Sequence, residues 1–241
     1  QALRDGDRIE PFEAVLTVMG PYQSFGFLEG IIDGILARRT SIATNVYDVI
    51  QAAGVSGKQK PIIFMGDRDD HFMQQAGDGY AAYIGGSQAQ ATHAMNEWWG
   101  VKGMGTMPHA LIQLFKGDVV VAAEAYHVTF PEDDLIVLVD YNNDVITDAL
   151  RVARHFGEAL KGVRIDTSRT MVDQYFIRNP EVMGSFDPRG VNAELVCALR
   201  RALDAEGFGH VQIVVSGGFD KDRILMFERE GVPVDMYGVG A

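Results

Sequence analysis

Cysteine is the scarcest residue of this chain. Cys197 is the only one among 241 residues, so no intramolecular disulfide can form and a disulfide-rich secreted domain is excluded. No run of about 18 apolar residues and no signal-peptide pattern occurs, so the sequence predicts no membrane span. Lys and Arg number 21 against 33 Asp and Glu, and the net charge of −12 argues against nucleic acid or an anionic membrane as a partner. A reducing, cytoplasmic setting fits these absences best.

What is present is an alternation of short apolar runs with helical patterns. The composition, 47% hydrophobic and 22% charged, is ordinary for a globular core. The runs are apolar on both faces, as are the strands of a parallel sheet covered by helices, so we predict an α/β fold. The expected strands lie at 14–21, 61–66, 135–140, 162–166, 211–215 and 234–240. The expected helices include 24–53 (one helix, or two joined near Arg39), 77–83, 88–98, 109–115, 145–160 and 193–205.

No linker or low-complexity segment divides the chain. We expect residues 1–55 to form a flanking strand and helices of the same compact unit, and residues 56–241 to form the barrel-like core. The chain begins at Gln1 without a methionine and stops just after a glycine loop, so we expect it to be a piece of a longer polypeptide.

Two predicted strands near the end of the chain lead into glycine turns. The first runs into Ser216, Gly217 and Gly218 and then a helix start at Asp220, while the second carries Gly238 and Gly240. A glycine turn at a helix N-terminus presents free N–H groups to an anion. Neighbouring loops of this kind at the carboxyl edge of a parallel barrel are typical of a phosphate site. The alternative is that both are ordinary tight turns.

Charged side chains follow other predicted strands. Asp140 and Asp166 each come directly after a buried run, where a carboxylate can bind ribose hydroxyls or a hydrated Mg²⁺. Arg164 precedes Asp166 by the period of a strand, so the two should lie side by side and could hold a phosphate and a hydroxyl. The alternative is that each aspartate caps the following helix.

Two further residues have a possible role in chemistry. His109 opens an apolar helix after a glycine-punctuated segment, where it could act as a proton shuttle or nucleophile, or be a structural histidine. Arg68 stands among three aspartates after the 61–66 run, as a solvated loop tip or as an arginine that binds a carboxylate.

Several segments, in this order, resemble the nicotinate phosphoribosyltransferase family of type II phosphoribosyltransferases, and the resemblance covers nearly the whole chain. The most specific is Gly105-Thr106-Met107-Pro108-His109-Ala110-Leu111, which is similar to the family's "GT-x-x-H" segment. The others are Leu28-Glu29-Gly30 through Ile42-Ala43-Thr44-Asn45, Tyr83-Ile84-Gly85-Gly86, Gly162-Val163-Arg164-Ile165-Asp166-Thr167, Ser216-Gly217-Gly218 and Tyr237-Gly238-Val239-Gly240.

The resemblance implies an irregular parallel β/α barrel that works as a homodimer with a shared active site. It implies transfer of the 5-phosphoribosyl group from phosphoribosyl pyrophosphate to nicotinate with Mg²⁺, and with ATP as co-substrate through a phosphorylated His109. Arg164 and Asp166 match residues that hold the phosphoribosyl group, and Arg68 matches an arginine of the base pocket. The 5-phosphate cradle is matched by Gly217, Gly218, Gly238 and Gly240.

Three positions depart from the family pattern. Arg68 is followed by Asp69 and Asp70 instead of a second arginine, Met65 replaces the aromatic that would cover the pyridine, and Gln88 stands where an aspartate is usual. Because of these departures, two alternatives stay open. The base could be nicotinamide or another small heterocycle, or the protein could be a non-catalytic paralogue that binds sugar phosphates. The family's N-terminal and C-terminal parts are expected to be missing from this chain.

Overall fold

A six-stranded parallel sheet forms the centre of the molecule. The computed structural model describes residues 3–184 and 186–240. The strand order is β2-β1-β6-β5-β4-β3, and every pairing is parallel. The strands are β1 (Ile62–Phe64), β2 (Ala89–Gln90), β3 (Leu135–Leu138), β4 (Leu160–Ile165), β5 (Gln212–Val215) and β6 (Met236–Val239).

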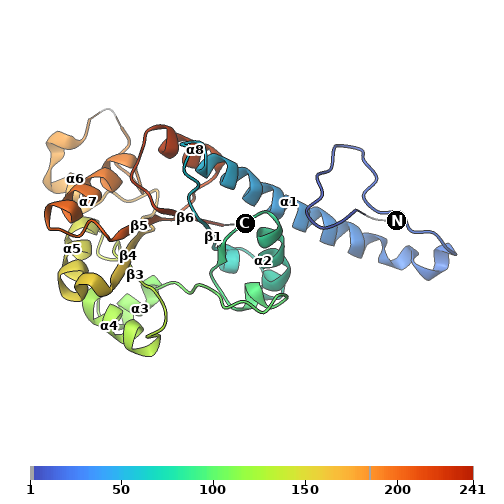
Figure 1. The fold of residues 1–241 in the computed structure, drawn as a ribbon, viewed down its shortest axis with the longest axis horizontal. Helices are drawn as coiled ribbons and strands as arrows, with labels where there is room; N and C mark the ends of the chain where they lie inside the picture. Colours follow the sequence, from blue (N-terminus) through green and yellow to red (C-terminus); the bar gives the residue numbers. More distant parts are fainter. Residues whose placement is uncertain (1–2, 185, 241) are drawn as a thin grey trace.

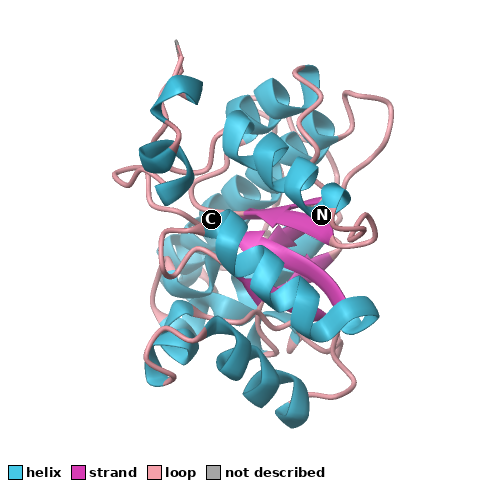
Figure 2. Ribbon diagram, turned by 90° about the vertical axis from the view of Figure 1, so that its left-hand side faces the viewer, coloured by secondary structure: helices cyan, strands magenta, loops and turns pink. Residues whose placement is uncertain are grey.

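Eight α-helices surround this sheet in the described part of the chain, as Figures 1 and 2 show. They are α1 (Glu29–Ala53), α2 (Gln75–Ile84), α3 (His109–Leu114), α4 (Val119–Thr129), α5 (Val145–Phe156), α6 (Gln174–Arg178), α7 (Ala193–Ala205) and α8 (Lys221–Arg229). Four of them are preceded by an N-cap residue whose side chain accepts a backbone N–H of the first turn, namely Asp118, Asp173, Asn192 and Asp220.

The strands are buried on both faces, as the apolar runs predict. On β1, Ile62 and Phe64 pack into the main core, whereas Ile63 between them lines an inner cavity. Val214 of β5 lines the same cavity and is fully buried. Because successive side chains of a strand point to opposite faces, one face of the sheet carries the helices and the other curls around the cavity.

The predicted α/β class is confirmed, in the form of a curled half-barrel. The strands β2 and β3 stand at the two ends of the strand order, and no ladder joins them among the described residues. The gap between them is lined by the segment 102–107, which follows β2 along the edge of the sheet through hydrogen bonds from Met104 and Gly105 N–H to Gln90 and Ala91 C=O.

Two of the predicted elements are wrong. Residues 14–21 belong to no strand of the sheet. Their side chains are mostly exposed, and their pairing in the described structure is limited to an isolated bridge at Leu16 and the hydrogen bond from the Leu3 N–H to the Val15 carbonyl. The helix expected over 88–98 is instead β2 followed by turns. Ala89 and Gln90 lie in register with Ile63 and Phe64, so pairing with β1 outweighs the helical spacing of this segment.

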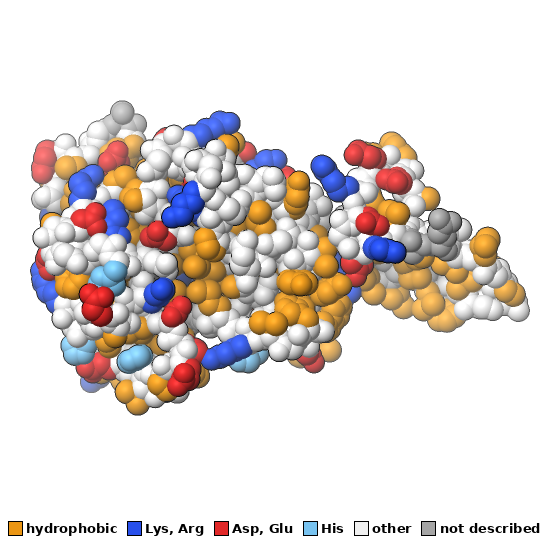
Figure 3. Space-filling model, viewed as in Figure 1, with side chains coloured by type: hydrophobic (Ala, Val, Ile, Leu, Met, Phe, Trp, Pro, Cys, Tyr) orange, Lys and Arg blue, Asp and Glu red, His pale blue; other side chains and the backbone are white. Residues whose placement is uncertain are grey.

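The helix α1 runs without a break through Arg39 and reaches away from the sheet at its amino end (Figure 1). Its buried residues all lie in its second half, from Ile42 to Ala53. The preceding segment exposes large apolar side chains, which Figure 3 shows along the projecting arm. None of the described helices has the length and apolar character that crossing a membrane requires.

A buried polar cluster ties together the elements that carry the glycine loops. The Glu228 carboxylate of α8 accepts hydrogen bonds from Tyr237 Oη of β6 at 2.6 Å and from Ser56 Oγ at 2.7 Å, and Lys60 Nζ lies 2.6 Å away. Burial alone would raise the pKa of Glu228, but the three donors outweigh burial and hold this pKa below its ordinary value. The cluster therefore fixes α8 against β6 and the segment before β1.

We expect Glu228→Ala to lower the free energy of unfolding by about 3 kcal/mol, because it leaves the Tyr237 hydroxyl and the Lys60 ammonium in a buried site without their acceptor. Tyr237→Phe, the matched control, keeps the ion pair and should lower it by only about 1.5 kcal/mol. Urea denaturation monitored by circular dichroism measures both values. A loss below about 0.5 kcal/mol for Glu228→Ala would contradict a stabilising role of the cluster.

Candidate functional site

The centre of the candidate site is Arg164, a buried cation on β4. Only 5% of its surface is exposed. Its Nη2 donates to the Met107 carbonyl at 3.0 Å, and its Nη1 donates to Ser216 Oγ at 3.0 Å. Nη1 also lies 3.3 Å from Asp166 Oδ2. The predicted neighbourhood of Arg164 and Asp166 is confirmed, and the arginine joins β4 to the end of β5 and to the segment before α3.

The two aspartates are linked to each other and do not cap helices. Asp166 accepts a hydrogen bond from Ser216 Oγ at 2.9 Å, and its backbone N–H donates to Asp140 Oδ2 at 3.2 Å. The residues at the N-caps of the following helices are Asp144 and Asp173. The helix-cap alternative for Asp140 and Asp166 is therefore wrong, and the carboxyl ends of β3, β4 and β5 bring their polar side chains together.

His109, the first residue of α3, stands beside this pair. Its Nε2 lies 3.2 Å from Asp140 Oδ1, and 40% of its side chain is exposed. Asp140 Oδ1 is buried, and its contact with His109 Nε2 combines a hydrogen bond of imperfect alignment with attraction between charges. The neighbouring Asp140 carboxylate raises the pKa of His109 against the opposing effect of partial burial.

The two glycine loops lie next to these residues. Gly217 and Gly218 have φ values of 89° and 72°, a left-handed conformation that favours glycine. A Cβ atom on Gly217 would stand 3.1 Å from Asp166 Oδ1. On Gly238 of β6 it would stand 3.0 Å from the Cβ of Ser216, so the second loop runs against the first. A side chain on Gly240 would collide with the Asp69 carboxylate, at 2.7 Å.

The three remaining candidate residues are placed differently. Met65 follows β1, donates its N–H to the Val239 carbonyl at 2.6 Å and lines the inner cavity. Arg68 is exposed in the turn after β1, at the same edge of the sheet, and forms no hydrogen bond or ion pair with the described residues. Gln88 lies at the opposite end of β1, where its Oε1 accepts the Ile62 N–H at 2.8 Å. The structure does not bring Gln88 to the others.

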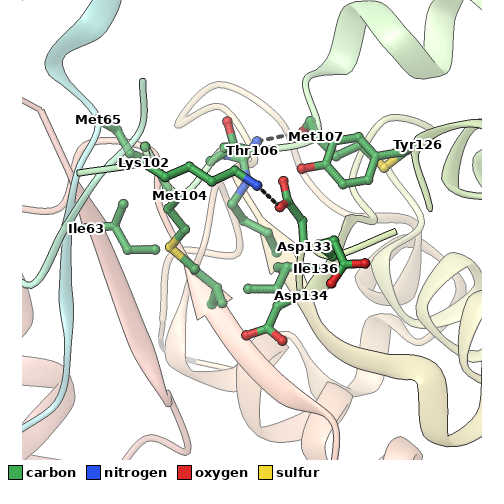
Figure 4. Close-up of a pocket in the computed structure, with 15 residues that line it drawn as sticks. Ile63, Met65, Lys102, Met104, Thr106, Met107, Tyr126, Asp133, Asp134 and Ile136 are labelled. Carbon is green, nitrogen blue, oxygen red and sulfur yellow. Dashed lines mark hydrogen bonds and ion pairs between the residues drawn. The ribbon is translucent and has the colours of Figure 1, made fainter. Parts of the chain in front are cut away.

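A cavity of about 360 Å³ lies inside the half-barrel. Its lining is mixed. The apolar part includes Ile63, Met65, Met104, Met107, Ile136 and Val214, and the charged part consists of Lys102, Glu132, Asp133, Asp134 and Arg164. Figure 4 shows Lys102 reaching across the opening to form an ion pair with Asp133. This volume lies in the range of pockets that bind a small organic ligand.

Two arginines at the first glycine loop are absent from the sequence-based candidates. Arg169 donates to the Gly218 carbonyl. Arg223, in the first turn of α8, donates to the Gly217 carbonyl at 2.9 Å and to the Gly218 carbonyl at 3.2 Å. Burial, and then the charge of Arg169, lowers the pKa of Arg223. The sequence signal that could have identified Arg223 is its position. It lies three residues after Asp220, in the first turn of a helix that starts at a glycine loop.

Comparison with known proteins agrees with the resemblance that the motifs indicate. No protein-family model matches the chain. Nicotinate phosphoribosyltransferase of Bacillus subtilis (strain 168) is 26% identical over an alignment of 245 residues that covers 99% of this chain and 44% of that protein. Nicotinate phosphoribosyltransferase pncB1 of Mycobacterium tuberculosis is 29% identical over 242 residues, covering 98% and 48%. The chain thus spans about half the length of the curated relatives it matches.

Solved structures also match over most of this chain. The crystal structure of nicotinate-nucleotide pyrophosphorylase from Pyrococcus furiosus matches with a TM-score of 0.67 and 31% identity, covering 84% of this chain and 46% of that one. Human nicotinic acid phosphoribosyltransferase matches with a TM-score of 0.69 and 19% identity, covering 99% and 54%, and supports the fold alone. The resemblance to the nicotinate phosphoribosyltransferase family that the motifs predict is confirmed along nearly the whole of this chain.

Proposed function

We propose that the protein transfers the 5-phosphoribosyl group from phosphoribosyl pyrophosphate to nicotinate, giving nicotinate mononucleotide for NAD synthesis. The observation that carries this proposal is the packing of Arg164, Asp166 and Ser216 against two glycine loops, in a chain whose curated relatives are named nicotinate phosphoribosyltransferase. A phosphate cradle beside hydroxyl-binding carboxylates is what a phosphoribosyl donor requires.

The reaction develops charge at two points of the substrate, and these residues can stabilise it. Displacement of pyrophosphate at C1 builds positive charge on the ribose ring and negative charge on the leaving group. Asp166 holds its carboxylate between Ser216 and Arg164, where it can accept ribose hydroxyls and face the developing positive charge. Because the contacts exist before the substrate binds, little reorganisation is needed during the reaction.

Mg²⁺ fits this site as a partner of the pyrophosphate. No group of three or more metal-binding side chains that could hold an ion alone is found in the described structure. Mg²⁺ is commonly held by one or two carboxylates together with substrate phosphates, and Asp140 and Asp166 offer them at neighbouring strand ends. When bound there, the ion would neutralise charge on the leaving pyrophosphate.

The pyridine ring is assigned to the cavity inside the half-barrel. Met65 and the other apolar walls can contact the ring, and the cavity is large enough for one small heterocycle. The free Arg68 guanidinium at this edge of the sheet is proposed to bind the nicotinate carboxylate, since arginine pairs with carboxylates through two parallel hydrogen bonds.

His109 is proposed to couple the reaction to ATP by accepting a phosphoryl group. Its Nε2 faces Asp140, while Nδ1 has no hydrogen-bond partner among the described residues and is the free nucleophilic nitrogen. We further propose a homodimer with a shared site. The segment before and within α1 supports it through large exposed apolar side chains that a partner could cover, namely Phe12, Met19, Tyr22, Phe27 and Ile31.

Steady-state synthesis of the mononucleotide from phosphoribosyl pyrophosphate and Mg²⁺ tests the proposal directly. We expect turnover with nicotinate, little with nicotinamide because it has no carboxylate for Arg68, and a higher rate when ATP is added. Liquid chromatography of the product measures each arm. Turnover with nicotinamide alone would reassign the base, and absence of turnover with both bases would reject the proposed activity.

Asp166→Asn is expected to lower kcat/KM by on the order of 100-fold, because it removes the charge that faces the ribose in the transition state. Asp204→Asn is the matched control, since that carboxylate is exposed on α7 and, among the described residues, forms an ion pair only with Arg200 of the same helix. The control should keep kcat/KM within about twofold of the wild type. A loss below tenfold for Asp166→Asn would show that this carboxylate has no role in the reaction.

The raised pKa of His109 predicts how ATP stimulation depends on pH. The imidazolium form persists above the ordinary pKa of about 6.5, and only the neutral ring is nucleophilic, so stimulation should rise with pH through the pKa of His109. Asp140→Asn should lower that pKa and move the rise to lower pH. Histidine NMR titration measures the shift.

In the NMR titration, the signal that is missing from His109→Ala identifies the resonance of His109. The same variant should lose the stimulation by ATP while slow basal transfer persists. Stimulation that survives in His109→Ala, or a pKa of His109 that stays unchanged in Asp140→Asn, would reject this part of the proposal.

A further inference from the structure

Arg223 is a partly buried arginine whose two terminal guanidinium nitrogens donate to backbone carbonyls. Its Nη1 donates to the Gly217 and Gly218 carbonyls, at 2.9 and 3.2 Å, and its Nη2 donates to the Val191 carbonyl just before α7. Its guanidinium lies over the Phe219 ring, 4.1 Å from the ring centre. No carboxylate forms an ion pair with it in the described structure. A cation held in this way stabilises the conformation of the backbone around it.

The contacts of Arg223 fix which way the loop N–H groups point. The described chain has no cis peptide bond, and in a trans peptide the C=O of one residue points opposite to the N–H of the next. Carbonyls of Gly217 and Gly218 that face Arg223 therefore turn the N–H groups of Gly218 and Phe219 away from it. Neither N–H donates to a described acceptor, so both are free for a ligand.

The free N–H groups belong to the same loop that approaches the reaction site. Gly217 lies against Asp166, and α8 begins just beyond the loop at Lys221. Without a partner for its carbonyls, a two-glycine loop with positive φ values would have many other conformations, because glycine restricts the backbone least. An anion would then have to order the loop as it binds, and affinity would be lost.

We propose that Arg223 is a positioning residue that holds the 216–220 loop, through the Gly217 and Gly218 carbonyls, in the conformation whose N–H groups receive the substrate phosphate. The inference rests on the proposed phosphoribosyl site. The role differs from that of Arg169, which is exposed, donates to Gly218 alone and keeps other donors for solvent or ligand. Arg223 acts from behind the loop and does not itself contact the phosphate.

Arg223→Lys is the informative substitution, because it keeps the charge but cannot form the three-carbonyl fork. Arg229→Lys, an exposed residue in the last turn of the same helix, is the matched control. The dissociation constant for ribose 5-phosphate, measured by calorimetry, should rise about tenfold or more in Arg223→Lys and stay within about twofold in the control. The KM for phosphoribosyl pyrophosphate should rise in the same way, while the KM for nicotinate should not change.

Backbone ¹⁵N order parameters of residues 216–220 in the ligand-free protein test the positioning independently of any activity. They should be lower in Arg223→Lys than in the wild type and the control, with an unchanged Tm. A second variant, Phe219→Leu, keeps the arginine but removes the ring beneath it and should give an intermediate effect. Equal order parameters and equal affinity in wild type and Arg223→Lys would overturn the inference. A wild type that does not bind ribose 5-phosphate would overturn the phosphoribosyl site itself, and the order parameters would still decide the role of Arg223.

Discussion

A single buried cation organises the site. The guanidinium of Arg164 lies within the curled sheet, where a charge without partners costs several kcal/mol, so the Met107 carbonyl, Ser216 and Asp166 must all be in place for the fold to be stable. These partners come from three separate stretches of the chain. The same contacts that satisfy the arginine therefore also set the positions of the carboxylate and hydroxyl that face the mouth of the half-barrel.

From that cation, a chain of contacts between polar residues runs outward through the site. Asp166 follows Arg164, its N–H donates to Asp140, and Asp140 in turn faces His109. The histidine is the most exposed of the four, and the neighbouring Asp140 carboxylate raises its pKa. Protonation at the surface is thus linked to a carboxylate that is itself tied to the buried arginine, and this arrangement places a titratable group within reach of solvent without exposing the rest.

The parts of the site that could be predicted from the sequence are those with local causes. Buried strands ending in Asp140, Asp166 and Ser216 follow from the apolar runs, and so do the glycine turns. Strand β2 could not be predicted, because two residues become a strand only through pairing with β1. The position of Gln88 and the role of Arg223 could not be predicted from local sequence patterns either, because their partners, Ile62 and Val191, lie 26 and 32 residues away in the sequence.

The open side of the half-barrel has a mechanical consequence. Between the 102–107 segment and β3 the described structure has no strand ladder, and the gap is crossed by side chains: Lys102 reaches Asp133, and Arg164 reaches the Met107 carbonyl. Side-chain contacts of exposed residues such as Lys102 rearrange within nanoseconds, whereas a strand pair separates only with the loss of several cooperative hydrogen bonds. A ligand can therefore widen the cavity at Lys102 by displacing its ion pair with Asp133, while the buried contact of Arg164 with Met107 and the strands that carry the reacting groups stay fixed.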